Sequence, residues 1–318
     1  MDPTPAQREA DRSPLGRLVR RLDLETADAA GAEAVGDLPG EAARAAPDEV
    51  TSGAPGADRF RVRPFAGEGW LFGGLVAALA VVAAGRTVEG RMLHSLHGYF
   101  LRPGRRRVPI EIEVERLRDG HVLAARRVEL RQGRDTTFAM LASFAPVQRG
   151  LAHQETSMPD VPPPEGLPDW EDVRAAAYGT ARRPDGPLEI RECEPEAAVP
   201  AAGQPARRRV WMRPRGALPD DPLVHAAVLV FASDRNFLST AARPHGLLLV
   251  ERLAASLDHA IWLHQPPRFD DWVLYASESP VAQSGRALVQ GAMYTRAGVR
   301  LASVAQEGII RAPRGPGE

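Results

Sequence analysis

The chain has 318 residues, of which 44% are hydrophobic and 25% charged, and its net charge of −1 gives no electrostatic reason to expect a nucleic acid or an anionic membrane as a partner. All 40 basic side chains are arginine, because the sequence contains no lysine. Mechanisms that need a lysine amine are therefore excluded: those of Schiff-base and pyridoxal-phosphate enzymes, Walker-A nucleotide hydrolases and protein kinases.

The cysteine content and the N-terminus favour an intracellular protein. Cys193 is the single cysteine, so it has no partner for an intramolecular disulfide. Its neighbours Glu192 and Glu194 would raise the pKa of its thiol, which makes it a poor nucleophile. Residues 1–14 lack the apolar segment of a signal peptide, and the most apolar run, 70–84, is shorter than a membrane span. We therefore expect a cytoplasmic protein with no membrane span.

Three segments precede or separate the two regions that show a repeated pattern. Residues 15–22 place apolar side chains at helical spacing and predict a short amphipathic helix. Residues 22–58 contain nine acidic side chains, one arginine and no aromatic residue, which is typical of a disordered insertion or a loose acidic loop. Residues 150–205 contain ten prolines, and we expect an extended linker there with one possible strand at 188–191.

Two regions show the same order of predicted elements, one helix followed by four strands. The first has a helix at 72–84 and strands at 93–101, 108–117, 122–131 and 136–146; the second has a helix at 223–242 and strands at 255–263, 272–279, 286–295 and 300–311. An offset of 165 residues places the turn glycine Gly120 on Gly285 and Gly133 on Gly298. This repeat predicts an α+β chain in which a sheet wraps around a buried helix, twice. A generic pair of α+β domains is the alternative.

The two copies differ in where they carry polar groups. The first helix segment, 71–88, carries no carboxylate, whereas Asp234 interrupts the apolar run of the second helix. A carboxylate in such a run costs several kcal/mol unless it is paired or functional. Pairing with Arg235 is one alternative, and capping a kink at Ser233 is another. Gln306 lies where the offset places Leu141, and an amide in place of a core leucine needs a partner.

Other catalytic constellations find less support. Two pairs of histidines are spaced so that their side chains would point to opposite faces of a strand, and no metal site is expected: His94 with His97 and His259 with His264. The G-x-S-x-G nucleophile elbow of a serine hydrolase is absent. Ser256 is predicted to face away from His259, so the two would not form a nucleophile–base pair.

A series of short motifs follows the chain in order. In the first copy these are LHSLHGYFLRPG at 93–104, LRDG at 117–120 and ARRV at 125–128; in the second they are DD at 220–221, ASDRNFL at 232–238, PHG at 244–246, SLDH at 256–259, WVLY at 272–275, ES at 278–279, YT at 294–295 and ASVAQEG at 302–308. Together they resemble the acyl-CoA thioesterase II (TesB-like) family over residues 68–311. The resemblance implies a double hotdog fold, without a metal or cofactor, in a homo-oligomer that is a dimer or a tetramer.

The resemblance also implies a reaction and its residues. Members of the family hydrolyse an acyl-CoA thioester to a free acid and CoA, and their catalytic aspartate, hydroxyl residue and glutamine correspond to Asp234, Ser256 and Gln306. Asp234 would be the general base for a water that Ser256 and Gln306 orient, without a covalent acyl-enzyme. Backbone N–H groups at Gly73 and Gly74, where the first helix begins, would meet the oxyanion.

Arginines are the expected ligands of the CoA phosphates, because the chain has no lysine. The candidates are a turn cluster and one residue near the C-terminal end: Arg105, Arg106, Arg107 and Arg311. The chain departs from the family at Leu75, where the family usually has glutamine after the Gly-Gly pair. The alternatives are a hotdog hydratase-dehydratase, for which His245 would partner Asp234, and a non-catalytic protein that binds acyl-CoA or an acyl-carrier protein.

The expected division of the chain combines these observations. It consists of the short helix and acidic insertion at 1–58, an N-terminal hotdog at 59–149, a Pro-rich linker at 150–185, a C-terminal hotdog with the catalytic residues at 186–312, and a tail at 313–318.

Overall fold

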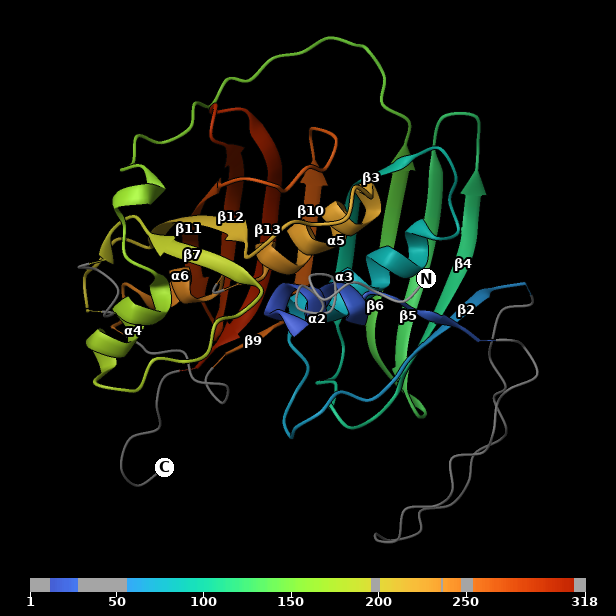
Figure 1. Ribbon diagram of the computed structural model, residues 1–318, viewed down its shortest axis with the longest axis horizontal. Coiled ribbons are helices and arrows are strands. Elements are labelled where there is room, and N and C mark those ends of the chain that lie inside the picture. The colour runs from blue at the N-terminus through green and yellow to red at the C-terminus, as the bar shows by residue number, and fades with distance from the viewer. Residues whose placement is uncertain (1–11, 28–55, 196–200, 236, 247–253, 312–318) are drawn as a thin grey trace, which may run out of the picture.

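A computed structural model describes residues 12–27, 56–195, 201–235, 237–246 and 254–311 (Figure 1). The acidic stretch at 28–55 and the tail at 313–318 lie outside the described residues, and so do the predictions made for them. Among the described residues, no helix is both long and apolar enough to cross a membrane.

The N-terminal copy wraps strands around an apolar helix. Its elements are α2 (Pro14–Arg21), β1 (Glu25–Thr26), β2 (Asp58–Val62), α3 (Gly73–Gly85), β3 (Met92–Phe100), β4 (Ile110–Asp119), β5 (Ala124–Gln132) and β6 (Asp135–Ala145). Helix α3 is buried from Gly74 to Ala84 because it is apolar on every side. In β4 the side chains of Ile110 and Ile112 are buried while Glu111 is exposed, which is the predicted alternation.

The C-terminal copy repeats this arrangement. Its elements are β7 (Leu188–Glu192), β8 (Arg207–Pro214), α5 (Pro222–Ser233), α6 (Ser239–Ala242), β9 (Ala254–Ser256), β10 (Asp258–Leu263), β11 (Val273–Gln283), β12 (Arg286–Thr295) and β13 (Arg300–Ile310). In each copy a strand that precedes the helix, β2 or β8, was not predicted from the sequence. Strand β3 of the first copy and strand β10 of the second pair with the last strand of their copy, β6 or β13.

One antiparallel sheet runs through both copies. Its strand order is β1-β2-β4-β5-β6-β3-β10-β13-β12-β11-β8-β7, with β9 paired to β13. Strands β3 and β10 join the copies, with Leu96 opposite Ile261. Figure 1 shows α3 and α5 side by side on one face of this sheet. The predicted α+β double hotdog is therefore the observed architecture.

We expected an extended linker, but part of it is helical. It contains a short 3-10 helix, η1 (Pro164–Gly166), and the helix α4 (Trp170–Tyr178). Asp169 caps the N-terminus of α4 by accepting a hydrogen bond from the backbone N–H of Glu171, and Gly179 ends it in the left-handed region with φ 58°. An aspartate before an acidic first turn and a glycine after the last turn are signals of a helix. The proline content obscured them.

The prediction of one continuous helix over 223–242 was wrong. Helix α5 ends at Ser233, and Asp234 is its C-cap residue; the chain becomes helical again at Ser239 in α6. The carboxylate of Asp234, at this end of α5, accepts a hydrogen bond from the backbone of α3.

The comparison of Gln306 with a core leucine was also wrong. Leu141 is 54% exposed, whereas Gln306 is 1% exposed. Side chains alternate between the two faces of a strand, so an offset that is wrong by an odd number of residues reverses the face. The buried neighbours Met140 and Ala142 are the positions of β6 that share the inward face of Gln306.

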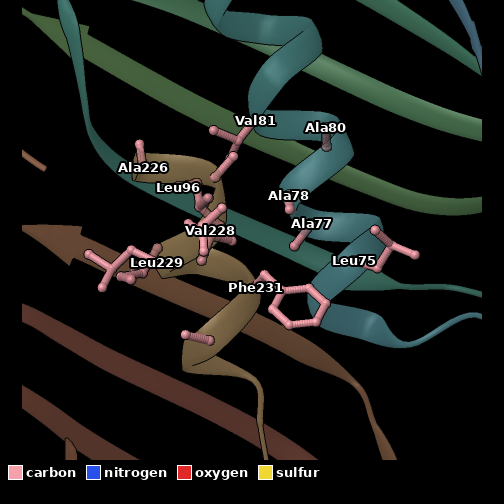
Figure 2. Packing of buried hydrophobic residues seen from close by; sticks show 14 of the residues in the cluster. Leu75, Ala77, Ala78, Ala80, Val81, Leu96, Ala226, Val228, Leu229 and Phe231 are labelled. Atoms are coloured by element: carbon pink, nitrogen blue, oxygen red, sulfur yellow. The ribbon is translucent and has the colours of Figure 1, made fainter. Parts of the chain in front are cut away.

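Helices α3 and α5 pack closely through small residues. Figure 2 shows Ala77 and Ala78 of α3 on the side that faces Val228 and Phe231 of α5. The two ends of this helix pair differ. A Cβ on Gly85 would lie 2.3 Å from the side chain of Leu223, and a Cβ on Gly73 would lie 2.8 Å from the carboxylate of Asp234.

A substitution of Gly98 tests the packing of the core where strand β3 lies beside strand β6. A Cβ there would lie 2.3 Å from the ring of Phe138 and 3.0 Å from Cβ of Met140, and the Phe138 ring is fully buried. We expect Gly98→Ala to lower the free energy of unfolding by about 1–3 kcal/mol, the usual cost of overpacking a core. Gly150→Ala is the matched control, since nothing lies within 4 Å of a Cβ at that position. Equal unfolding midpoints for the two variants in denaturant titrations would contradict the described core.

Candidate active site

The three residues singled out by the sequence line one pocket. Asp234, Ser256 and Gln306 meet at a cavity of about 760 Å³ between the start of α3 and the C-terminal copy. Asp234 comes from the end of α5, Ser256 from β9 and Gln306 from β13. Segments separated by up to 72 positions in sequence thus place a carboxylate, a hydroxyl and an amide around the same space.

The carboxylate of Asp234 is held by the first turn of α3. Its Oδ2 accepts a hydrogen bond of 2.6 Å from the backbone N–H of Gly74. The side chain can approach this closely because Gly73 has no Cβ. The N-terminus of a helix carries unpaired N–H groups and the positive end of the helix dipole, so it is a suitable place for a carboxylate. The structure thus gives the Gly74 N–H a different partner from the substrate oxyanion that we expected.

Burial dominates the protonation of Asp234. It raises the pKa of this carboxyl above the ordinary aspartate value, because the charged form loses its hydration. Four neighbouring groups lower the pKa and partly oppose this shift: His259, the Gly74 N–H, the Gln306 amide and Arg235. A buried carboxyl with a raised pKa in a pocket is typical of a general acid or base.

Gln306 connects the hydroxyl of Ser256 to a histidine. Its Nε2 donates to Ser256 Oγ over 2.7 Å, and its Oε1 lies 2.6 Å from His259 Nδ1. We had expected Ser256 and His259 to face apart, as they would on one regular strand. The chain is not one strand there: β9 ends at Ser256 and β10 begins at Asp258, with Leu257 between them. Both side chains consequently reach Gln306.

His259 is the site residue that the sequence analysis missed. It is 1% exposed, and its second ring nitrogen, Nε2, lies 2.8 Å from Oγ of Ser233. Periodicity could not find it, because periodicity placed it on the wrong face. The signal was its position beside Ser256 in the motif SLDH, on the strand that forms the seam between the copies.

The remainder of the pocket is mainly apolar. Aromatic and aliphatic side chains from both copies line it: Leu71, Phe72, Val76, Phe100, Phe237, Leu238 and Leu257. Leu75, the departure from the family pattern, is buried in the core and is not among the described lining residues. At the exposed end of the pocket lie Trp70, which is 49% exposed, and Arg102.

The four arginines predicted to bind the CoA phosphates do not lie together around the pocket. Arg105 lies over Trp70, with its Cζ 5.6 Å from the ring centroid. The other two members of the turn cluster have partners elsewhere, since Arg106 donates to the carbonyl oxygen of Ala66 and Arg107 forms an ion pair with Glu68 at 2.8 Å. Arg311 is exposed beyond the end of β13. Arg102, which the sequence analysis did not single out, is closer to the expected role because it lines the pocket.

Two further sequence candidates lie outside the pocket. His245 is exposed after α6 and forms a β-bridge with Ala202, so it does not accompany Asp234 as a hydratase histidine would. Cys193 is buried, and burial together with Glu194 and Glu192 raises the pKa of its thiol to about 12. Within the described part of the chain, no group of three or more metal-ligating side chains is placed to hold a metal ion.

Comparisons with known proteins cover both copies. A family model described as acyl-CoA thioesterase matches residues 187–309, and one described as acyl-CoA thioesterase N-terminal domain matches residues 62–145. Acyl-coenzyme A thioesterase 8 of Mus musculus is 37% identical over 257 residues, which are 76% of this chain and 80% of that protein. Acyl-CoA thioesterase 2 of Haemophilus influenzae is 35% identical over 251 residues, 76% of this chain and 87% of that protein.

A solved structure agrees with these relatives. The crystal structure of the acyl-CoA thioesterase II TesB2 from Mycobacterium marinum has a TM-score of 0.67 and 38% sequence identity, and the match covers 82% of this chain and 94% of that one. The chain therefore belongs to the acyl-CoA thioesterase II (TesB-like) family of thioester hydrolases, with its double hotdog fold.

Proposed function

We propose that this chain hydrolyses acyl-CoA thioesters to a carboxylic acid and CoA by a water that Asp234 activates, without a covalent acyl-enzyme. The observation that carries the proposal is the arrangement of Asp234, Gln306 and Ser256 at the buried part of an apolar pocket. An apolar wall suits an acyl chain, and the three polar groups suit an oriented water.

The donors and acceptors of the site define how that water would be held. Ser256 Oγ accepts from Gln306, so the hydroxyl hydrogen of Ser256 is directed to another acceptor. An ionised Asp234 accepts only, and each of its two oxygens has two lone pairs, so the bonds from the Gly74 N–H and the Gln306 amide leave acceptor sites for the water. A water that donates to Asp234 and accepts from Ser256 retains a lone pair for the thioester carbon.

The reaction then balances with the groups of this site. Water forms the new C–O bond as Asp234 takes its proton, and the tetrahedral intermediate breaks its C–S bond. The CoA thiolate leaves and takes the proton from Asp234, which returns to its ionised form. We assign the oxyanion to the backbone N–H of Gly73 at the positive end of α3, since Gly74 binds Asp234.

The exposed end of the pocket supports a site for the nucleotide of CoA. Trp70 offers an aromatic face for the adenine, and Arg105 and Arg102 offer planar guanidinium groups for the phosphates. Arg105 lies outside the described lining of the pocket but over Trp70, which belongs to it. Arg106, Arg107 and Arg311 are secondary candidates, because they lie outside that lining and the first two bind Ala66 and Glu68. A dimer or tetramer, and a cytoplasmic location, stay predictions.

Replacement of Asp234 by asparagine tests the general base. Asparagine keeps an acceptor for the Gly74 N–H but takes no proton from water, so we expect Asp234→Asn to lower kcat by about 10²–10⁴-fold. The unfolding temperature at pH 7 should not fall, because the variant removes a buried charge whose raised pKa opposes folding above about pH 4. The release of thiol from a panel of acyl-CoA substrates measures kcat, and calorimetry measures the unfolding temperature. A variant that keeps more than about a tenth of kcat would contradict the assignment.

The pH dependence of the rate tests the state of the same carboxyl. The reaction needs ionised Asp234, and burial raises its pKa, so the acid limb of kcat/KM should lie clearly above the ordinary aspartate value of about 4. An acyl-pantetheine substrate avoids the titration of the CoA phosphates. A rate that stays constant down to pH 4 would show that this carboxyl does not act as a base with a raised pKa.

Substitutions at the exposed end test the nucleotide site. Stacking on an aromatic side chain contributes about 1–3 kcal/mol per base, so Trp70→Ala should raise KM for acyl-CoA by roughly 5- to 100-fold. The kcat/KM for the matching acyl-pantetheine, which lacks the nucleotide, should stay within twofold. Arg105→Ala should act in the same direction, and Arg107→Ala is the matched control because that guanidinium pairs with Glu68. Equal effects on both substrates would place the nucleotide elsewhere.

A further inference from the structure

The buried histidine at the seam of the two copies is placed to control the catalytic amide. We propose that His259 is a positioning residue, which orients the Gln306 amide so that the hydroxyl of Ser256 acts as a hydrogen-bond donor into the pocket. The inference rests on the proposed water-activating function and adds to it the group that sets the direction of the hydrogen bonds.

His259 and Gln306 are in direct contact in the protein interior. His259 Nδ1 and Gln306 Oε1 lie 2.6 Å apart and are both buried. An amide oxygen only accepts hydrogen bonds, so the proton of this bond belongs to Nδ1. The tautomer or protonation state of His259 that carries a proton on Nδ1 is therefore the one that this arrangement requires.

The contact with His259 sets the direction of the next hydrogen bond, from Gln306 to Ser256. With Oε1 turned toward His259, Nε2 of Gln306 is the atom that faces Ser256, and it donates to Oγ over 2.7 Å. The inverted amide would place its NH₂ group against Nδ1–H and its oxygen against Ser256. Ser256 would then donate to Gln306 and would lose its donor to the water. The imidazole therefore selects one of two amide orientations, and only that one leaves Ser256 as a donor to the pocket.

The imidazole ring of His259 is also held from its other side. Nε2 of His259 lies 2.8 Å from Oγ of Ser233, the residue that precedes Asp234. The ring of Phe237 packs edge-on at a centroid distance of 6.4 Å. His259 is not among the described residues that line the pocket. It consequently acts through Gln306, and not on the substrate.

Two substitutions at one position separate the hydrogen bond from the space that the ring fills. Asparagine places its amide NH₂ near the position of Nδ1 and keeps a donor for Gln306. Glutamine places its amide near Nε2, beside Ser233, and loses the donor at Nδ1. We expect His259→Gln to lower kcat by about 10²-fold, with KM within threefold, since small misplacement of a catalytic group has costs of this size. We expect His259→Asn to retain kcat within tenfold of the wild type.

A double-mutant cycle with Ser256 provides the readout that a merely structural role would not move. If His259 acts through Gln306 on Ser256, then His259→Gln should cost less than threefold in a Ser256→Ala background, because the hydroxyl that it orients is gone. Full additivity of the two losses would overturn the proposal, and so would equal kcat for His259→Asn and His259→Gln. Circular dichroism and unfolding midpoints show that each variant is folded, and His259→Phe replaces His259→Gln if that variant does not fold. A wild-type chain that releases no thiol would instead overturn the proposed function.

Discussion

The hydrogen bond between Asp234 and the first turn of α3 is the constraint on which the rest of the site depends. A buried carboxylate is expensive, and here the cost is partly offset by the backbone N–H of Gly74 at 2.6 Å and by the positive end of the helix dipole. This contact requires glycine at position 73, because a Cβ would lie 2.8 Å from the carboxylate. Helix α5 ends at Ser233, and its C-cap residue Asp234 makes this contact. The carboxylate that we propose as the base thus belongs to the C-terminal copy but is held by the N-terminal one, at the place where the two copies meet.

The same helix pair explains why the described site lies at one end. At the other end of the α3–α5 contact, Leu223 occupies the space beside Gly85. A leucine side chain there fills the core and supplies no base. The copies keep the common order of strand, helix and four strands, while their polar residues have diverged. The N-terminal copy contributes the glycine turn and part of the apolar wall, and the C-terminal copy contributes the carboxylate, the hydroxyl, the amide and the histidine.

Sequence reasoning predicted the repeat, the α+β class and Asp234 from local patterns, whereas it selected Gln306 through a comparison with Leu141 that the structure shows to be wrong. The periodicity of apolar residues predicts the helices and the alternating strands, and a single carboxylate in an apolar run is easily recognised in the sequence. What it missed depends on irregular backbone. The break at Leu257 allows Ser256 and His259 to reach the same amide, and an offset between β6 and β13 that differs from the one assumed made exposed Leu141 look like a core position. Neither is visible in composition or spacing, because each depends on where a regular strand is interrupted.

The central claim is that water attacks the thioester directly while Asp234 only moves its proton. A single turnover in H₂¹⁸O, with enzyme in excess over an acyl-CoA and rapid quenching, followed by mass spectrometry of the acid and of the peptide that contains Asp234, tests it most directly. The account predicts one ¹⁸O atom in the released acid, none in Asp234 and no acylated chain at any time point. An acyl adduct on the protein, or ¹⁸O in the Asp234 carboxyl, would contradict it.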